Sequence, residues 1–320
     1  MKICNPDFHA INLKDMKPDL KQPYVFNSIS GLHRALGLPK PLHPLLSLVD
    51  YSDITTDTSE ISKGMVLNFY KVSYKKNFAG RIKYGQSYYD FDEGGMSFVS
   101  PGQLISAAAD EADYGGYTLL FHPDFIRAYP LGRNIKNYGF FSYSASEALY
   151  LSDKEKEILI GIFATISHEL SLSIDRFSQD IMISQIEQLL NYSNRFYNRQ
   201  FITRKIPNNE LLTKMEALMD DYFNSQKTLV AGLPTVQLMA GSLNVTPRYL
   251  SDMLRAHTGQ NTQQYIQGRL IEKAKELLSS TGLSVAEIAY QLGFEHPQSF
   301  NKIFKRKTAV SPVEFRQSFN

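Results

Sequence analysis

An internal repeat in the last hundred residues constrains this chain more than any other feature. Apolar residues recur with the spacing i, i+3, i+4 and i+7 in two stretches that lie 49 residues apart: Val236, Met239, Ala240 and Leu243, then Val285, Ile288, Ala289 and Leu292. This spacing places each set on one face of a helix. Each set is followed by a turn and a second apolar face: Leu250, Met253 and Leu254, then Phe300, Ile303 and Phe304. A period shared by helix, turn and helix indicates a duplicated unit.

The repeated unit has the features of a helix-turn-helix. Ala240 and Ala289 are small enough to let the second helix of each pair cross the first closely, and the turn sets a steep angle between them. Helix-start signals agree with this interpretation: the capping-box pair Ser284 and Glu287, Thr246 before Pro247, and Pro297 at the start of the last unit. A single such match could be an ordinary corner in a helix bundle. Two in tandem, separated by a further helix, favour paired helix-turn-helix units.

Before the repeat, the residue pattern changes once, from strand-like to helix-like. Up to about residue 145, aromatic and β-branched runs alternate with Gly, Asp, Asn and Pro clusters, which predicts an antiparallel sandwich or barrel: MVLNFYKVSY, QSYYDF, MSFV, QLISAA and YTLLFH. From residue 151 to 202 two amphipathic helices are expected, the first with Ser152 and Glu155 at capping-box spacing. They either pack on the sandwich or form a dimer interface, and the pattern leaves both open. The polar stretch 203–209 is expected to be a linker.

Composition excludes several classes of protein. The chain has 320 residues, 43% of them hydrophobic, which is enough for real cores. The single cysteine, Cys4, excludes intramolecular disulfides and a cysteine-based zinc site, and it indicates a reducing compartment, the cytoplasm. No apolar run is long enough to span a membrane, and the first residues do not have the pattern of a secretory signal. The net charge is only +2, but no acid occurs from His296 to Lys307.

The stretches SVAEIAYQLGF and SFNKIFKRKTAVSPVEFR resemble the C-terminal signature of the AraC/XylS family of bacterial transcription regulators. The resemblance covers residues 208–320 closely. It implies a cupin-like effector domain at 1–150, helical dimerisation at 151–202 and a DNA-binding domain at 210–320. Within that domain it implies helix-turn-helix units at about 234–257 and 284–307, joined by a linker helix at about 261–279. The implied partners are double-stranded DNA, a second copy of the chain, a small-molecule effector and RNA polymerase; no cofactor and no membrane contact are expected.

The DNA-contacting residues are expected on the faces that the apolar stripes leave outward. On the first recognition helix these are Arg248, Ser251, Asp252 and Arg255; on the second they are Pro297, Gln298, Ser299, Lys302, Lys305 and Arg306. By analogy with the family, Arg248, Ser251, Asp252, Pro297, Gln298, Ser299 and Lys302 stand at base-reading positions. Arg and Lys suit guanine and Gln suits adenine, whereas Lys305, Arg306 and Lys307 suit phosphates. The alternative to DNA contact for these basic residues is a solvent-exposed helix face without a binding role.

Asp252 departs from the family pattern, because many relatives carry a basic residue there. An acid near phosphates is repelled, so Asp252 either accepts a hydrogen bond from a cytosine amino group or pairs locally with Arg248 or Arg255. The whole domain is also only weakly basic. Binding is therefore expected to depend on dimerisation, or on two helices acting together, more than on a strong field.

The front half resembles a cupin hairpin at EGGMSFVSPGQLIS, residues 93–106, but it lacks the metal ligands of metal cupins. None of the seven histidines forms a His-x-His pair, and Ile105 stands where a ligand would follow the Pro-Gly turn. No metal is therefore expected. Aromatic residues are dense here and either pack the sandwich or line an effector pocket, with basic side chains to meet an anion. The pocket candidates are Tyr70, Arg81, Tyr84, Tyr88 and Tyr89.

The residues bear on three possible functions. The leading one is a DNA-binding transcription regulator whose front domain binds an effector and dimerises. The second is a regulator without a small-molecule effector, controlled by protein contacts or by its abundance. The third, an enzyme with a DNA-binding tail, lacks the reactive cysteines, phosphate loop, nucleophile elbow or metal cluster that it would need, so no catalytic residue is expected.

Overall fold

The structure is a computed structural model that describes residues 23–318, apart from 57, 59, 60, 62, 63, 77–81, 85, 86, 90–93, 106–114, 145, 146, 204 and 226. The chain divides into two compact units. The first contains the residues up to Phe141 together with Ala148–Ser193. The second contains Ser142–Glu147 together with Asn194–Asn320. A short segment from the β-rich part of the sequence therefore belongs with the C-terminal helices.

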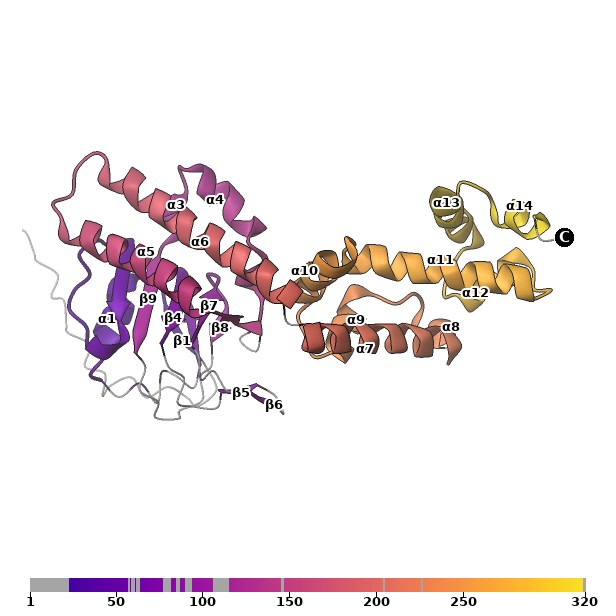
Figure 1. The fold of residues 1–320 in the computed structure, drawn as a ribbon, viewed down its shortest axis with the longest axis horizontal. Coiled ribbons are helices and arrows are strands. Elements are labelled where there is room, and N and C mark those ends of the chain that lie inside the picture. Colours follow the sequence, from indigo (N-terminus) through magenta and orange to yellow (C-terminus); the bar gives the residue numbers. More distant parts are fainter. Residues whose placement is uncertain are drawn as a thin grey trace, which may run out of the picture. The chain divides into compact units, whose positions relative to one another are not determined.

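Strands dominate the first unit (Figure 1). They are β1 (Tyr24–Phe26), β2 (Leu46–Asp50), β3 (Met65–Leu67), β4 (Tyr70–Lys75), β5 (Ile82–Tyr84), β6 (Ser87–Tyr89), β7 (Gly95–Val99), β8 (Leu104–Ile105), β9 (Gly116–Phe121) and β10 (Leu149–Tyr150). They form a three-stranded sheet in the order β1-β3-β8, a five-stranded sheet in the order β10-β7-β4-β9-β2, and the hairpin β5-β6. Only the β1–β3 pair is parallel among the pairs described.

The predicted fold class is confirmed: a β-rich front is followed by helices and an all-helical C-terminal region. The described strands do not close into a barrel. The run MVLNFYKVSY, expected as one strand, is divided at Asn68 and Phe69, so that β3 lies in one sheet and β4 in the other. Phe69 is fully buried at this break and belongs to the apolar cluster of the unit.

The five-stranded sheet has two differently covered faces. On one, Leu120 and Val49 pack with Leu67 of β3 and with Ile29 of the short helix α1 (Ile29–Ala35). On the other, the rings of Tyr74 and Tyr117 lie 6.3 and 5.7 Å from that of Phe163. Phe163 belongs to helix α5, which crosses this face with α6 (Figure 1). The alternation of β4 and β9 therefore separates an inner sandwich face from a helix-covered face.

The helices of the first unit were only partly predicted. The two long ones are α5 (Asp153–Ser171) and α6 (Ser178–Thr203), and the capping box at Ser152 and Glu155 is present. The stripe of α6 is buried: Ile183, Ile186, Leu189 and Leu190. The region expected to be all strand also contains short helices: α1, α3 (Pro123–Ile126), α4 (Pro130–Asn134) and the 3-10 turns η2 (Tyr51–Asp53), η3 (Ile135–Asn137) and η4 (Gly139–Ser142). Proline at the first position starts both α3 and α4.

The second unit is helical throughout. It contains the last turns of α6 and the helices α7 (Lys205–Asn224), α8 (Lys227–Ala231), α9 (Val236–Ser242), α10 (Pro247–Thr258), α11 (Thr262–Ser280), α12 (Val285–Gln291), α13 (Pro297–Thr308) and α14 (Pro312–Gln317). Helix α7 begins inside the stretch 203–209. Pro207 is compatible with this because the first amides of a helix have no partner within it. The role of 203–209 as a linker stays a prediction.

Candidate nucleic-acid interface

Helices α9 and α10 form the first helix-turn-helix unit. Met239 and Ala240 of α9 are fully buried, and α10 turns Leu250, Met253 and Leu254 into the same interior. The turn between the helices includes Asn244 with φ of 55°, a conformation that Asn tolerates better than most residues. Thr246 then caps α10 by accepting a hydrogen bond from the Tyr249 amide, and Pro247 occupies the first helical position, as predicted.

Helices α12 and α13 form the second unit. One apolar cluster joins them to α11 through buried side chains that include Ile288, Ala289, Leu292, Phe294, Phe300 and Phe304. The turn depends on Gly293, whose φ is 94°. A Cβ atom there would lie 2.7 Å from the carbonyl carbon of Gly232, so the turn and the chain ahead of α9 are in close backbone contact. The predicted capping box at Ser284 and Glu287 is present.

Helix α11 connects the two units. Six of its apolar side chains are buried: Ile266, Leu270, Ile271, Ala274, Leu277 and Leu278. All except Ile266 belong to the apolar cluster that α11 shares with α12 and α13. Its N-terminus also holds the first recognition helix, because the hydroxyls of Thr262 and Ser251 lie 3.0 Å apart. Ser251, expected to read a base, is therefore half-buried and already engaged with α11.

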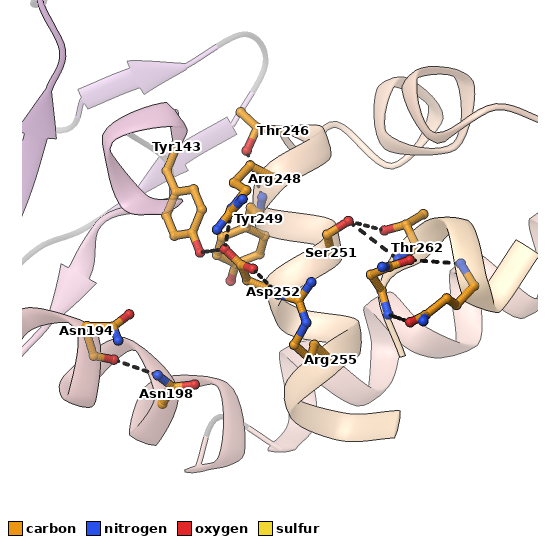
Figure 2. A network of polar contacts seen from close by, with 12 residues as sticks. Tyr143, Asn194, Asn198, Thr246, Arg248, Tyr249, Ser251, Asp252, Arg255 and Thr262 are labelled. Carbon is orange, nitrogen blue, oxygen red and sulfur yellow. Dashed lines mark hydrogen bonds and ion pairs between the residues drawn. The ribbon is translucent and has the colours of Figure 1, made fainter. Parts of the chain in front are cut away.

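The charged residues of α10 form one ion-paired group (Figure 2). Arg248 donates from Nε to Asp252 at 2.9 Å, and Arg255 donates to the other carboxylate oxygen at 2.8 Å. Both arginines stay about half exposed, at 44% and 53% of the side chain. The local pairing expected as one alternative for Asp252 is therefore what the structure has, with both arginines instead of one.

Two residues that the sequence analysis missed contact the same helix. The hydroxyl of Tyr143 donates to Asp252 at 2.9 Å. The carboxylate of Glu147 accepts hydrogen bonds from the amide of Thr246 at 2.6 Å and from its hydroxyl at 2.8 Å. Burial, with the Asp252 charge, raises the pKa of Tyr143, so the phenol remains a donor. Burial also raises the pKa of Glu147, which the hydrogen bonds from Thr246 and Ser144 partly offset.

Aromatic packing holds this contact in place. The ring of Tyr143 meets Tyr197 of α6 and Tyr249 of α10 edge-on, with centroids 5.2 and 5.3 Å apart. Phe201 packs against Tyr249 from the other side at 5.2 Å. The backbone oxygen of Phe201 also lies 2.8 Å from Nε2 of His257, near the end of α10. The last turns of α6 and the residues around Tyr143 thus enclose one side of the first recognition helix.

The second recognition helix presents a different surface. Phe300 and Phe304 point inward, while five of the predicted contact residues are exposed: Gln298, Ser299, Lys302, Lys305 and Arg306. Pro297 is half-buried at the first helical position. Among the described residues, none of the acids forms an ion pair with Lys302, Lys305, Arg306 or Lys307. This face of α13 therefore combines open hydrogen-bonding side chains with cations that no described acid pairs within ion-pair distance, although the charge of Lys305 also acts on Glu314 of α14.

Of the five residues predicted to line an effector pocket, Tyr70 has a described side chain. Tyr70 packs within an aromatic cluster, stacked on Phe121 at 5.0 Å and edge-on to Phe141 at 5.2 Å. Arg81 lies outside the described residues, and the side chains of Tyr84, Tyr88 and Tyr89 do as well. In the described parts of the chain, no group of three His, Cys, Asp or Glu could hold a metal ion. No described helix is long and apolar enough to cross a membrane.

The inner sandwich face carries polar residues that the sequence analysis did not single out. Tyr51 donates to Ser73 at 2.9 Å, and the hydroxyls of Ser73 and Thr118 lie 3.1 Å apart. Burial lowers the pKa of Lys75 to about 8. Burial alone would raise the pKa of Tyr51, but the charges of Lys71 and Lys75 together with the hydrogen bonds to Ser73 and Thr118 lower it. The three hydroxyls are hydrogen-bonded to one another, which offsets the cost of burying them.

Comparisons with known proteins agree with the geometry of the second unit. Residues 239–318 match the family of the helix-turn-helix domain. The uncharacterized HTH-type transcriptional regulator YfiF of Bacillus subtilis is 29% identical over 146 residues, which cover 46% of this chain and 43% of YfiF. The HTH-type transcriptional activator RhaS of an Enterobacter strain is 30% identical over 120 residues, 37% of this chain and 41% of RhaS. The chain thus spans less than half the length of these relatives.

Among solved structures, ToxT from Vibrio cholerae covers 85% of this chain and 98% of its own, with 14% identity and a TM-score of 0.29. The DNA-binding domain of AdpA, in complex with a target DNA, covers 35% of this chain with 23% identity and a TM-score of 0.29. Apart from these structures, the match of residues 239–318 and the helices themselves make the second unit a helix-turn-helix domain. It is of the AraC type, which confirms the resemblance identified from the sequence.

Proposed function

We propose that this protein is a sequence-specific, DNA-binding transcription regulator in which α10 and α13 enter successive major grooves. The observation that carries the proposal is the outer face of α13. Its N-terminal residues project from a rigid apolar support, expose amide, hydroxyl and ammonium groups, and are followed by a run of cations. This is the arrangement that a recognition helix needs in order to read bases and hold phosphates.

We assign the contact roles as in the sequence analysis, except that Ser251, Asp252 and Pro297 take supporting roles in place of base reading. Gln298, Ser299 and Lys302 read bases of one half-site, and Lys305 and Arg306 hold phosphates beside it. Arg248 and Arg255 serve the other half-site, in which Asp252 limits their charge. Pro297 starts α13, and Ser251 supports α10 through Thr262. Selection of bound fragments from random and genomic DNA by the full chain tests the function. Enrichment of one motif supports it, and no enrichment at moderate salt contradicts it.

The first unit is proposed to bind a small-molecule effector. The buried hydroxyl row of Tyr51, Ser73 and Thr118, with Lys71 and Lys75 near it, supports this, because small β-sandwiches and barrels can enclose one ligand beside a few polar groups. Thermal-shift screening of anionic and neutral metabolites tests it, since a ligand of the folded state raises the melting temperature with concentration. If no compound does so, the alternative stands: a regulator controlled by protein contacts or abundance.

Dimerisation is proposed through the turn between α5 and α6. Both helices pack on the sheet, yet this turn and the start of α6 expose a group of large apolar side chains: Leu172, Ile174, Phe177 and Ile181. Ile174 is 72% exposed. Light scattering on a Phe177→Glu variant should report a monomer where the unaltered chain reports a dimer. Leu104→Glu, at another exposed apolar position, should leave the dimer intact. As a bacterial gene regulator, the protein would act in the cytoplasm.

A further inference from the structure

The first recognition helix has an intramolecular occupant, whereas no segment among the described residues covers the outer face of the second in the same way. We define the clasp as Tyr143, Ser144 and Glu147. Its two contact side chains are almost fully buried, with exposed fractions of 6% for Tyr143 and 5% for Glu147. Glu147 holds the amide and the hydroxyl of Thr246, and it also accepts from the Ser144 amide at 2.6 Å. Each of its carboxylate oxygens therefore has a hydrogen-bond donor.

The clasp binds a single side of α10. Thr246, Tyr249 and Asp252 are three residues apart, so they line one stripe of the helix and its cap. Glu147 contacts the first. The ring of Tyr143 meets the second, and the hydroxyl of Tyr143 bonds the third (Figure 2). This stripe includes Asp252 and borders Arg248, two of the positions expected from the sequence to read bases.

The place that Glu147 occupies is one that suits a DNA phosphate. The N-terminus of a helix presents amide groups and a positive dipole end, which together bind anions. Here the Thr246 amide and hydroxyl already bind a carboxylate. A phosphate cannot take the same donors while the carboxylate holds them, and the two negative charges repel each other. Tyr143 also orients Asp252 through a hydrogen bond. Asp252 pairs with Arg248 and Arg255, so these two cations are less available to DNA phosphates.

We propose that the clasp is an autoinhibitory contact that competes with DNA for α10 and leaves α13 free to bind. This inference rests on the proposed function. Helix α13 would engage its half-site first, and α10 would engage the other only after the clasp opens. Because the binding-competent state is then only partly populated, the apparent affinity is lower than the intrinsic one by that fraction.

The clasp is also connected to the unit proposed to sense an effector. Residues 142–147 belong to the second unit, while the chain on both sides, Phe141 and Ala148, belongs to the first. Phe141 is buried there with Phe98 and Tyr70. The proposed effector row lies on the other face of the same sheet, but its Ser73 shares strand β4 with Tyr70. An effector that shifts β4 would therefore change the packing of Phe141, two residues from Tyr143, and bias the clasp between its closed and open states.

The test is an anisotropy titration of labelled DNA with the full chain. Two probes are used: the selected site, and the same site with the α10 half scrambled. Glu147→Ala removes the carboxylate, and Tyr143→Phe removes a single hydroxyl. Two matched controls lie in the first unit: Glu157→Ala loses one exposed negative charge, and Tyr138→Phe loses a hydroxyl that bonds Asn191. Thermal melting confirms that each variant is folded.

We expect Glu147→Ala to bind the intact site about tenfold more tightly and Tyr143→Phe about threefold, because hydrogen bonds to charged groups contribute on that scale. The controls should bind like the unaltered chain, and the scrambled probe should show no gain. If the clasp variants bind the intact site equally or more weakly, the contact is structural and the inference fails while the proposed function stands. If no protein binds either probe, both fail. Should Glu147→Ala not fold, Tyr143→Phe decides alone.

Discussion

The predicted DNA-contacting residues of α10 and α13 differ in their interactions within the protein. The sequence left two roles open for Asp252, which were to read a cytosine or to pair with an arginine. In the structure it forms ion pairs with two arginines, Arg248 and Arg255. Its other partner, Tyr143, is 109 positions away in the chain, and Glu147 lies 99 positions from Thr246. Neither lies in a periodic segment. Pattern reading therefore finds the outward face of α10 but has no signal for the residues that cover it.

Lys302 provides the clearest test of base reading at the residue scale. It is exposed on α13 and forms no ion pair with the described acids. Lys302→Ala should relax base preference in one half-site only, at a cost of about 1–3 kcal/mol in binding free energy to the preferred sequence. Lys307→Ala, at a phosphate position, should instead weaken all sequences alike. Titrations against single-base variants of the selected site distinguish the two, and equal losses for both variants on all sequences would contradict the assignment.

Glu147 also predicts a dependence of stability on pH. Burial raises its pKa above the ordinary value of about 4.3, so the folded state keeps a proton that the unfolded state has lost. The stability that this residue contributes is greatest below the unfolded pKa and falls as pH rises through the folded pKa. Its hydrogen-bond partners, Ser144 and Thr246, are neutral. The measurement is the free energy of unfolding by urea as pH rises from about 4.5, for the unaltered chain and for Glu147→Gln. The unaltered chain should lose stability relative to the variant over this range. A relative gain would contradict the prediction.

At the scale of elements, prediction succeeds where signals are local. The caps at Thr246 and Ser284, the buried stripes of α9 and α12, and the aromatic core of α13 follow from spacing and residue type. The sheet order β10-β7-β4-β9-β2 does not, because strand pairing joins segments far apart in sequence. The break between β3 and β4 has the same cause: Phe69 is apolar in a run of strand-forming residues, and only its burial in the sandwich explains the bend.

The turn of the second helix-turn-helix unit is expected to tolerate no side chain at Gly293. Gly293→Ala should destabilise the second unit by about 2 kcal/mol or more, because φ is positive and the new Cβ would meet the backbone of Gly232 and Leu233. Gly268→Ala, in α11 with open space around the Cβ, should instead stabilise by roughly 0.5–1 kcal/mol. Chemical unfolding measures both. A neutral Gly293→Ala would mean that the turn is looser than described.

For the whole molecule, the residue pattern predicts a β-rich N-terminal part and a helical C-terminal part, and the structure has both. The residue pattern gave no sign that residues 142–147 belong with the second unit. That assignment follows from hydrogen bonds and ring contacts between residues about a hundred positions apart. The same division places the proposed effector row in one unit and both recognition helices in the other.

The central claim is that two recognition helices of one chain read adjacent major grooves. Hydroxyl-radical footprinting of the selected site tests it most directly, with the unaltered chain and Glu147→Ala compared at equal occupancy. We predict two protected patches on one face of the DNA with centres about 10 bp apart, and stronger protection at the α10 patch in Glu147→Ala. A single patch that persists in both proteins, with no second patch at that spacing, would contradict the account.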